Sequence, residues 1–192
     1  MNRYRRNILT IVRELVAPLG PMATVLDYGA GDGWFGQALL DERLAGSVTG
    51  VDCRPRAYYY LKPLLYDGQN VPLADGACEL GAAIDVLHHT PDPRAAIAEL
   101  ARCTSKYLLL KDHVVRGRWD RVVLAILDEL GNRRFGVPSP HHYQQGWEWN
   151  DCIEQAGFEL QRLVHPAACH RGLLGWGTNH LQFVALWKRR HA

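Results

Sequence analysis

The sequence lacks the long apolar run that would mark a membrane-spanning helix. No apolar run approaches the roughly 20 residues that a span requires, and Arg13 and Glu14 interrupt the apolar positions near the amino terminus. Internal repeats and low-complexity tracts are absent as well. We therefore expect a chain that is neither secreted nor anchored and that has no membrane partner.

Cysteine is present but not in the patterns that build a disulfide framework or a zinc site. The five cysteines are widely spaced, odd in number and contain no C-x-x-C. This distribution favours reduced thiols and a cytoplasmic location. We expect no bound metal.

The chain also lacks a strong charge of either sign. Its formal net charge is +2, so nothing in the overall balance favours nucleic acid or an anionic membrane as a partner. Local basic positions at Arg3, Arg5, Arg6, Arg133 and Arg134 are interpreted as solvated surface arginines. A length of 192 residues with 47% hydrophobic residues predicts one globular domain over 1–192.

The first two thirds of the chain alternate between strand and helix patterns. An amphipathic helix is predicted within residues 1–20, before Pro18, Gly20 and Pro21. Strands are predicted at 24–27, 48–51, 64–66, 80–84 and 107–110, with helices from Trp34 and over 93–103. This alternation predicts an α/β fold with a parallel sheet, whose ligand binds at the carboxyl ends of the strands.

The final third has a different pattern. Helices are predicted over 118–130 and 147–156, with a loop rich in Gly, Pro and His over 131–143. Two strands, 158–164 and 181–187, follow with no helix apparent between them, and adjacent strands without a crossover helix should pair antiparallel. The segment 114–146 interrupts the alternation directly after the fifth strand, so we expect it to form a lid or acceptor pocket.

The glycine-rich turn after the first strand is the strongest functional signal. It reads Leu-Asp-Tyr-Gly-Ala-Gly-Asp-Gly over 26–33, and Asp52 follows nineteen residues after Gly33. Glycines allow the backbone to approach a ligand closely, and an acidic residue at the end of the second strand can accept hydrogen bonds from ribose hydroxyls. Together these features predict an adenosine site.

The same stretch supports a nicotinamide cofactor as an alternative. Residues 31–36 match G-x-G-x-x-G, the dinucleotide fingerprint of an NAD(P)-dependent oxidoreductase. However, the carboxylate of Asp27 at the strand end would repel a pyrophosphate and attract a cationic sulfonium. The Tyr-x-x-x-K pattern from Tyr58 to Lys62 lies too early in the chain for a hydride-transfer site. A cofactor-binding protein without transferase activity is a third alternative.

Four motifs in order resemble those of class I S-adenosylmethionine-dependent methyltransferases, close to the small ubiquinone-biosynthesis-like branch. They lie at 26–33, 51–52, 66–76 and 86–92, and the similarity extends from about Met22 to Lys188. The resemblance implies a Rossmann-like, doubly wound, seven-stranded sheet of order 3-2-1-4-5-7-6 with strand 7 antiparallel. It implies S-adenosylmethionine as cofactor and S-adenosylhomocysteine as product. The cofactor-binding residues that it implies are Asp27, Gly29, Gly31, Gly33, Asp52, Cys53, Asp67, Gly68 and Asp85.

Within that resemblance, Asp52 would hold the ribose, Cys53 would flank the adenine and Asp67 would accept from its amino group. Two positions depart from the family pattern. Cys78 and Glu79 replace the usual Phe-Asp before the fourth strand. Asp85 stands where the backbone usually meets the amino group of the cofactor, and its carboxylate either helps there or is solvated.

The acceptor side is less well defined. Methyl transfer is an in-line displacement that requires alignment of the reactants, and a general base is needed only if the acceptor arrives protonated. Candidate catalytic residues are His113, His89 and Asp112, although a histidine at position 89 is often structural in the family. His88 and Lys111 lie at the same strand ends. We predict a metal-independent enzyme that methylates a small molecule.

Further polar residues follow the fifth strand. Arg133 and Arg134 could meet an anionic acceptor, but a basic surface loop is the favoured interpretation. His141, His142 and Tyr143 could line the mouth of the same site. A metal site at His165, Cys169 and His170 is not favoured.

Overall fold

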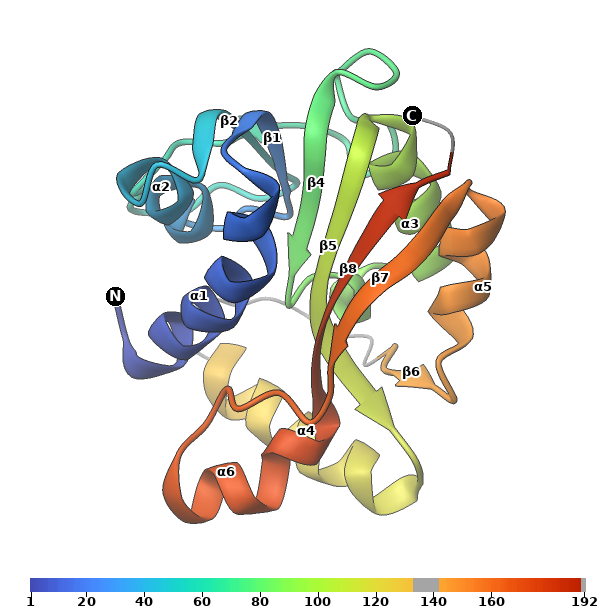
Figure 1. The fold of residues 1–192 in the computed structure, drawn as a ribbon. Coiled ribbons are helices and arrows are strands. Elements are labelled where there is room, and N and C mark those ends of the chain that lie inside the picture. Colours follow the sequence, from blue (N-terminus) through green and yellow to red (C-terminus); the bar gives the residue numbers. More distant parts are fainter. Residues whose placement is uncertain (133–141, 191–192) are drawn as a thin grey trace.

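The computed structural model describes residues 1–132 and 142–190, with side chains described up to Leu127 before the gap. Seven strands form one sheet in the order β3-β2-β1-β4-β5-β8-β7 (Figure 1). They are β1 (Met22–Tyr28), β2 (Ala45–Asp52), β3 (Leu64–Leu65), β4 (Cys78–Ile84), β5 (Thr104–Val115), β7 (Phe158–Val164) and β8 (Gln182–Arg189). The two-residue β6 (Gln144–Gln145) pairs with the end of β5.

The strand directions confirm the predicted topology. β1, β2, β3, β4 and β5 are mutually parallel, whereas β8 is antiparallel to both β5 and β7. Apart from the short β6, β7 and β8 are the sixth and seventh strands, so the order is the expected 3-2-1-4-5-7-6. The carboxyl ends of β1, β2, β4 and β5 therefore meet at one edge of the sheet.

Helices cover both faces of the sheet (Figure 1). α1 (Arg3–Val16) and α2 (Trp34–Asp41) pack on one face, and α3 (Pro93–Arg102) and α5 (Glu148–Gln155) on the other. The central strands are buried on both sides: Leu108 and Leu110 face α3 and α5, whereas Leu109 faces α1 and α2. Such strands show a nearly continuous apolar run, as β5 does.

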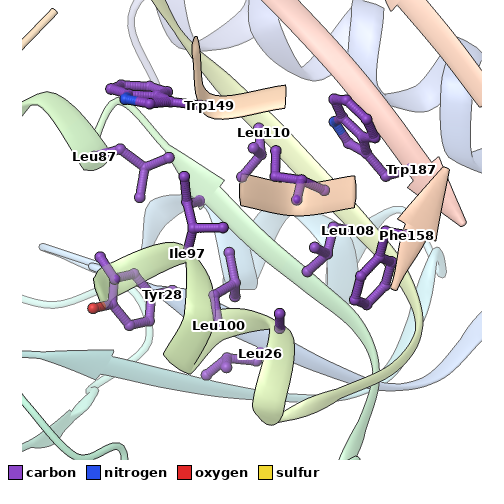
Figure 2. Packing of buried hydrophobic residues seen from close by; sticks show 14 of the residues in the cluster. Leu26, Tyr28, Leu87, Ile97, Leu100, Leu108, Leu110, Trp149, Phe158 and Trp187 are labelled. Atoms are coloured by element: carbon purple, nitrogen blue, oxygen red, sulfur yellow. The ribbon is translucent and has the colours of Figure 1, made fainter. Parts of the chain in front are cut away.

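The apolar side chains of α3 fill the core on their face of the sheet. Ile97 and Leu100 pack among Leu26, Tyr28 and Leu108 (Figure 2). Asp92 caps this helix by accepting hydrogen bonds from the backbone N–H groups of residues 94 and 95, and Pro93 occupies its first turn. This local chemistry is the reason the sequence predicts the start of α3 correctly.

The connection between the last two strands differs from the prediction. A helix, α6 (Gly172–Thr178), lies between β7 and β8, followed by the 3-10 turn η3 (Asn179–Leu181). Its sequence, GLLGWGT, holds three glycines, and glycine is a poor helix former. The structure explains one of them: a Cβ on Gly175 would lie 2.5 Å from the carbonyl oxygen of His170. The expected antiparallel pairing is nevertheless correct.

Two further differences concern the segment after β4. β5 runs to Val115, five residues beyond the predicted strand end, so the expected lid segment begins as strand. α4 (Arg118–Asn132) covers the predicted helix 118–130 and continues two residues further. Arg133, Arg134 and His141 lie outside the described residues. Among the described helices, none is long and apolar enough to cross a membrane.

Candidate functional site

The glycine turn after β1 adopts a backbone conformation that only glycine accepts readily. Gly29, Gly31 and Gly33 have φ values of +69°, +61° and +72°. A Cβ on Gly29 would lie 2.4 Å from Cγ1 of Val86, so the turn after β1 touches a residue two positions beyond the end of β4. Gly33 is the N-cap residue of α2. The turn is therefore shaped as expected, while its contact with a cofactor stays a prediction.

Asp52 fastens this turn to the end of β2. Its carboxylate accepts hydrogen bonds from the backbone N–H of Gly31 at 2.8 Å and of Arg54 at 2.9 Å. A carboxylate oxygen has more than one acceptor site, so these bonds leave capacity for a ribose hydroxyl. Cys53, predicted to flank the adenine, lies beside Gly68, another predicted cofactor-binding residue: a Cβ on Gly68 would lie 3.0 Å from Sγ of Cys53.

Asp67 and Asp27 occupy contrasting environments. Asp67 is exposed, and hydrogen bonds from the backbone N–H groups of Asn70 and Gln69 lower the pKa of its carboxyl. Asp27 is buried beneath the glycine turn, where it accepts a hydrogen bond from the backbone N–H of Gly36 at 3.1 Å. Burial raises the pKa of Asp27 to about 7. A cation placed above this turn would favour the ionised form.

Residues of α1 close over the same edge of the sheet, which sequence reasoning missed. The hydroxyl of Tyr4 donates to Asp85 at 2.8 Å, and the guanidinium of Arg5 forms an ion pair with Asp32 at 2.8 Å. Arg5 also lies over the ring of Trp34. The interpretation of Arg5 as a solvated arginine is therefore wrong, whereas Arg3 and Arg6 are exposed as expected. No short motif signals these contacts, because their partners are distant in sequence.

Asp85 is the counter-ion of a fully buried lysine. The ammonium of Lys111 donates to Asp85, to the hydroxyl of Tyr4 at 2.5 Å and to Oε1 of Gln182 at 2.7 Å. Burial opposes ionisation of Asp85, but the charges of Lys111 and His113 outweigh it and lower its pKa. Asp85 also has a left-handed backbone, with φ of +56°. Its carboxylate is thus held in a network, and the alternative of a merely solvated side chain is wrong.

Asp112 bridges two buried histidines. Its Oδ1 lies 2.6 Å from Nδ1 of His88 and 3.3 Å from Nδ1 of His113. The backbone N–H groups of Leu87 and His113 donate to the same carboxylate at 3.0 and 2.8 Å. Burial raises the pKa of Asp112, but the charges and hydrogen bonds of the two histidines outweigh it and hold the pKa well below its usual range.

His113 is suited to accept a proton. Burial, followed by the charge of Lys111, lowers the pKa of its imidazole. The neutral ring that donates from Nδ1 to Asp112 keeps its Nε2 lone pair available. Of the predicted catalytic residues, Asp112 and His113 are thus in contact. The second histidine that contacts Asp112 is His88, not the predicted His89. His89 contacts the ring of His88, with centroids 3.9 Å apart.

The side chains of His88, Asp112 and His113 include the donor types that bind divalent cations, and their ligand atoms lie within 4.8 Å of one another. The 2.6 Å separation between His88 and Asp112 is that of a short hydrogen bond, and it leaves little room for an ion between them. The expectation of a metal-independent site stays a prediction.

A cavity of about 300 Å³ lies within the predicted lid region and beside it. Its lining residues are Val114, Val115, Arg116, Gln145, Gly146, Trp147 and His165. Tyr143, which belongs to the predicted lid region, lies near the histidines, with its ring centroid 5.9 Å from that of His113. His142 is exposed and bonds to the carbonyl of Thr90.

The three polar residues of the loop after β7 contact other parts of the protein and do not cluster with one another. His165 bonds to the carbonyl of His180, Cys169 is buried, and His170 stacks on Tyr4 with ring centroids 4.7 Å apart. In the described parts of the chain, the three residues do not form a group that could hold a metal ion.

Several solved structures have a similar fold. A putative methyltransferase from Bacillus halodurans is 15% identical with a TM-score of 0.65, covering 94% of this chain and 97% of its own. Magnesium protoporphyrin IX methyltransferase from Synechocystis, solved with bound S-adenosylhomocysteine, is 18% identical with a TM-score of 0.64, covering 98% and 84%. The [4+2]-cyclase SpnF is 15% identical with a TM-score of 0.67, covering 97% and 81%. At these identities the likeness shows the fold alone, and the cyclase illustrates that one fold can support different reactions.

The sequence comparisons are more specific about the family. No curated protein sequence gives a significant match. The family model described as a methyltransferase domain matches residues 1–163, which include the glycine turn, the ends of β2 and β4, and the Asp112–His113 pair. The chain therefore belongs to the methyltransferase domain family, as a class I enzyme that depends on S-adenosylmethionine.

Proposed function

We propose that this methyltransferase acts on a small-molecule acceptor that arrives protonated, with His113 as the general base. The observation that carries the proposal is the pairing of a buried carboxylate, Asp112, with an imidazole whose pKa is lowered. Such a pair orients one ring nitrogen, and the lowered pKa leaves the other unprotonated and able to accept a proton near neutral pH. His89 is proposed as a secondary catalytic candidate only, since its ring contacts His88 rather than Asp112.

The cofactor would lie over the carboxyl ends of β1 and β2. Asp27, Gly29, Gly31 and Gly33 would border its methionine part, Asp52 its ribose, and Cys53, Asp67 and Gly68 its adenine. The residues suit this ligand, because backbone without side chains lies beside two buried carboxylates, Asp27 and Asp52. Asp85 would act near the amino group of the cofactor through its backbone, since its carboxylate is bonded to Lys111 and Tyr4.

The chemistry assigned to the chain is alignment and proton transfer. When bound, S-adenosylmethionine supplies a methyl group on a sulfonium and leaves as S-adenosylhomocysteine. The residues of this chain would hold the acceptor atom in line with that methyl group. The proton of the acceptor passes to Nε2 of His113, and Asp112 stabilises the imidazolium that results.

The acceptor would enter through the region of residues 114–146, which we propose as the lid of a single domain over 1–192. An anionic acceptor group could meet Arg116, which lines the cavity beside Val114. A cytoplasmic location is also proposed, consistent with five cysteines that are all free. No role for nucleic acid is proposed.

The test is turnover of methyl-labelled S-adenosylmethionine against a panel of small hydroxyl, amine and acid acceptors. For the acceptor that reacts, His113→Gln should lower kcat by roughly 100-fold or more, the usual range for loss of a general base. His180→Gln, at a half-exposed histidine outside the proposed acceptor region, is the matched control. The loss should shrink as pH rises toward the pKa of the acceptor itself. An unchanged kcat in His113→Gln would overturn the assignment.

The alternatives predict different outcomes in the same assay. An oxidoreductase would bind NAD and would not release S-adenosylhomocysteine. A catalytically inactive cofactor-binding protein would bind S-adenosylhomocysteine without turning over any acceptor in the panel.

A further inference from the structure

α4 carries an apolar stripe on its outer surface. Trp119, Val122, Val123 and Ile126 follow the i, i+3, i+4, i+7 spacing of one helix face, and all four are exposed. Leu124, on the opposite side of the helix, is fully buried against Val115, Tyr143 and Leu181. α4 is therefore apolar on two sides, although only its inner side packs against the rest of the protein.

α6 shows the same feature in a more pronounced form. Its small residues Gly175 and Thr178 point inward and are buried, whereas Leu173 and Trp176 are each 88% exposed. This arrangement reverses the pattern of an ordinary surface helix, which buries its large apolar residues. A globular protein gains nothing in its own stability from an indole left in water.

The two helices lie at the same end of the molecule. Figure 1 shows α4 and α6 together below the carboxyl end of β5. η3, which directly follows α6, contacts α4 twice: Leu181 packs on Leu124, and His180 lies 3.7 Å from Asp120. We call Trp119, Val122, Val123, Ile126, Leu173, Leu174 and Trp176 the apolar end surface.

Among the described side chains around the apolar end surface, the charges have one predominant sign. The sequence of α4 also holds Asp128 and Glu129, which lie beyond those side chains. Between residues 116 and 127 and between 171 and 178 there are four arginines, Arg116, Arg118, Arg121 and Arg171, all exposed, against one acidic residue, Asp120. Asp120 is itself engaged, because it accepts a hydrogen bond from the backbone N–H of Arg116 and lies near His180. The described part of the surface is thus apolar at its centre and positive around it.

We propose that the apolar end surface docks on an anionic lipid bilayer at the level of the headgroups. Tryptophan and leucine on an amphipathic helix enter the boundary between headgroups and acyl chains, and flanking arginines meet anionic headgroups. Both exposed indoles fit this chemistry, because tryptophan favours an interface with one apolar and one polar side. The sequence-based expectation of no membrane partner rested on the absence of a long apolar run and on the overall charge. A surface that binds a membrane peripherally requires neither a long apolar run nor a large net charge.

A second copy of the chain fits the surface less well. A two-fold contact would place the same patch against itself, and so would bring like-charged arginines together across the interface. A bilayer of opposite charge has no such penalty. The surface also adjoins the proposed acceptor side, since Tyr143 packs with Leu124 and contacts the ring of His113.

The test is co-sedimentation of the full chain with vesicles of phosphatidylserine mixed into phosphatidylcholine, compared with vesicles of phosphatidylcholine alone. We expect binding to the anionic vesicles that weakens with added salt. Trp119→Ser with Trp176→Ser should lower the partition coefficient on the order of tenfold or more, because both interfacial anchors are lost. Arg118→Gln with Arg171→Gln should lower it on anionic vesicles only.

The matched control is Leu160→Ser with Leu163→Ser, two exposed apolar residues on β7, and it should bind as the original chain does. Near-normal thermal unfolding of every variant verifies folding. Failure of the chain to bind anionic vesicles, or equal binding by the tryptophan variant, would overturn the proposal. Self-association abolished by the tryptophan variant without vesicle binding would assign the surface to a second copy instead. Calorimetry with S-adenosylhomocysteine tests the proposed function separately, since docking does not require turnover.

Discussion

The proposed site has a methyl-donor side over the ends of β1 and β2 (the donor side) and a methyl-acceptor side at the ends of β4 and β5 (the acceptor side). The two sides hold their carboxylates by different means. On the donor side, Asp27 and Asp52 accept hydrogen bonds from backbone N–H groups of Gly36, Gly31 and Arg54. On the acceptor side, Asp112 also accepts from the backbone N–H groups of Leu87 and His113. However, Asp112 and the partly buried Asp85 are held in addition by the side chains of Lys111, His88 and His113. Backbone amides orient a carboxylate without cancelling its charge, whereas a lysine neutralises it. The donor side therefore keeps carboxylates without a cationic side-chain partner, as the proposed cationic ligand requires, whereas the acceptor side has cationic partners of its own.

The largest effect on the acceptor side is expected from removal of its buried cation, Lys111. Lys111→Met should destabilise the fold by about 3 to 5 kcal/mol, because it leaves Asp85 charged and partly buried without its partner. Lys106→Met is the control, since its ion pair with Glu79 is largely exposed and should be worth about 1 kcal/mol or less. Chemical denaturation measures both. Equal effects would show that Asp85 does not depend on Lys111.

The double variant Lys111→Met with Asp85→Asn sharpens the same test. Removing both charges should recover part of the lost stability, because no unpaired charge then remains inside. Strict additivity of the two substitutions would contradict the ion pair.

A smaller effect is expected from Asp27 on the donor side, and it depends on pH. Its folded-state pKa of about 7 lies above the ordinary value of 3.8, so the folded state binds more protons in this window. The contribution of Asp27 to stability should therefore fall by roughly 2 to 4 kcal/mol as pH rises between those two values, and stay level above. Unfolding free energies of the original chain and of Asp27→Asn, measured across this range, give the difference.

The cofactor should counteract this loss of stability at higher pH. A sulfonium near Asp27 favours its ionised form, so S-adenosylmethionine should stabilise the protein more at pH 8 than at pH 5, and Asp27→Asn should remove the difference. A pH-independent difference between the original chain and the variant would contradict the buried position of this carboxyl.

The donor side could be predicted from sequence because its determinants are local. The glycines of the turn between Gly29 and Gly33 are needed for a backbone that the structure does adopt, and Asp52 ends the next strand along the chain. The glycine turn and Asp52 belong to one βαβ unit. The strand order followed instead from the resemblance to a family whose motifs recur in a fixed order along the chain.

The acceptor side could not be predicted in the same way because its contacts span the chain. Tyr4 bonds to a residue 81 positions away and to Lys111 at a separation of 107. Lysine is almost never fully buried, so the sequence does not predict that Lys111 is the buried partner of Asp85. α6 was hidden by its glycines, and its outward-facing Trp176 has no signature in an ordinary helix pattern.

The central claim is that the donor side is shaped and charged for S-adenosylmethionine, and calorimetric titration tests it most directly. S-adenosylhomocysteine and NAD are titrated in parallel into the original chain, into Asp52→Ala, and into Asp41→Ala as a control on the exposed end of α2. We predict that S-adenosylhomocysteine binds, that NAD does not, and that Asp52→Ala alone loses about 1.5 to 3 kcal/mol of binding free energy per ribose hydrogen bond. Binding of NAD but not of the homocysteine nucleoside, or an unaltered affinity in Asp52→Ala, would contradict it.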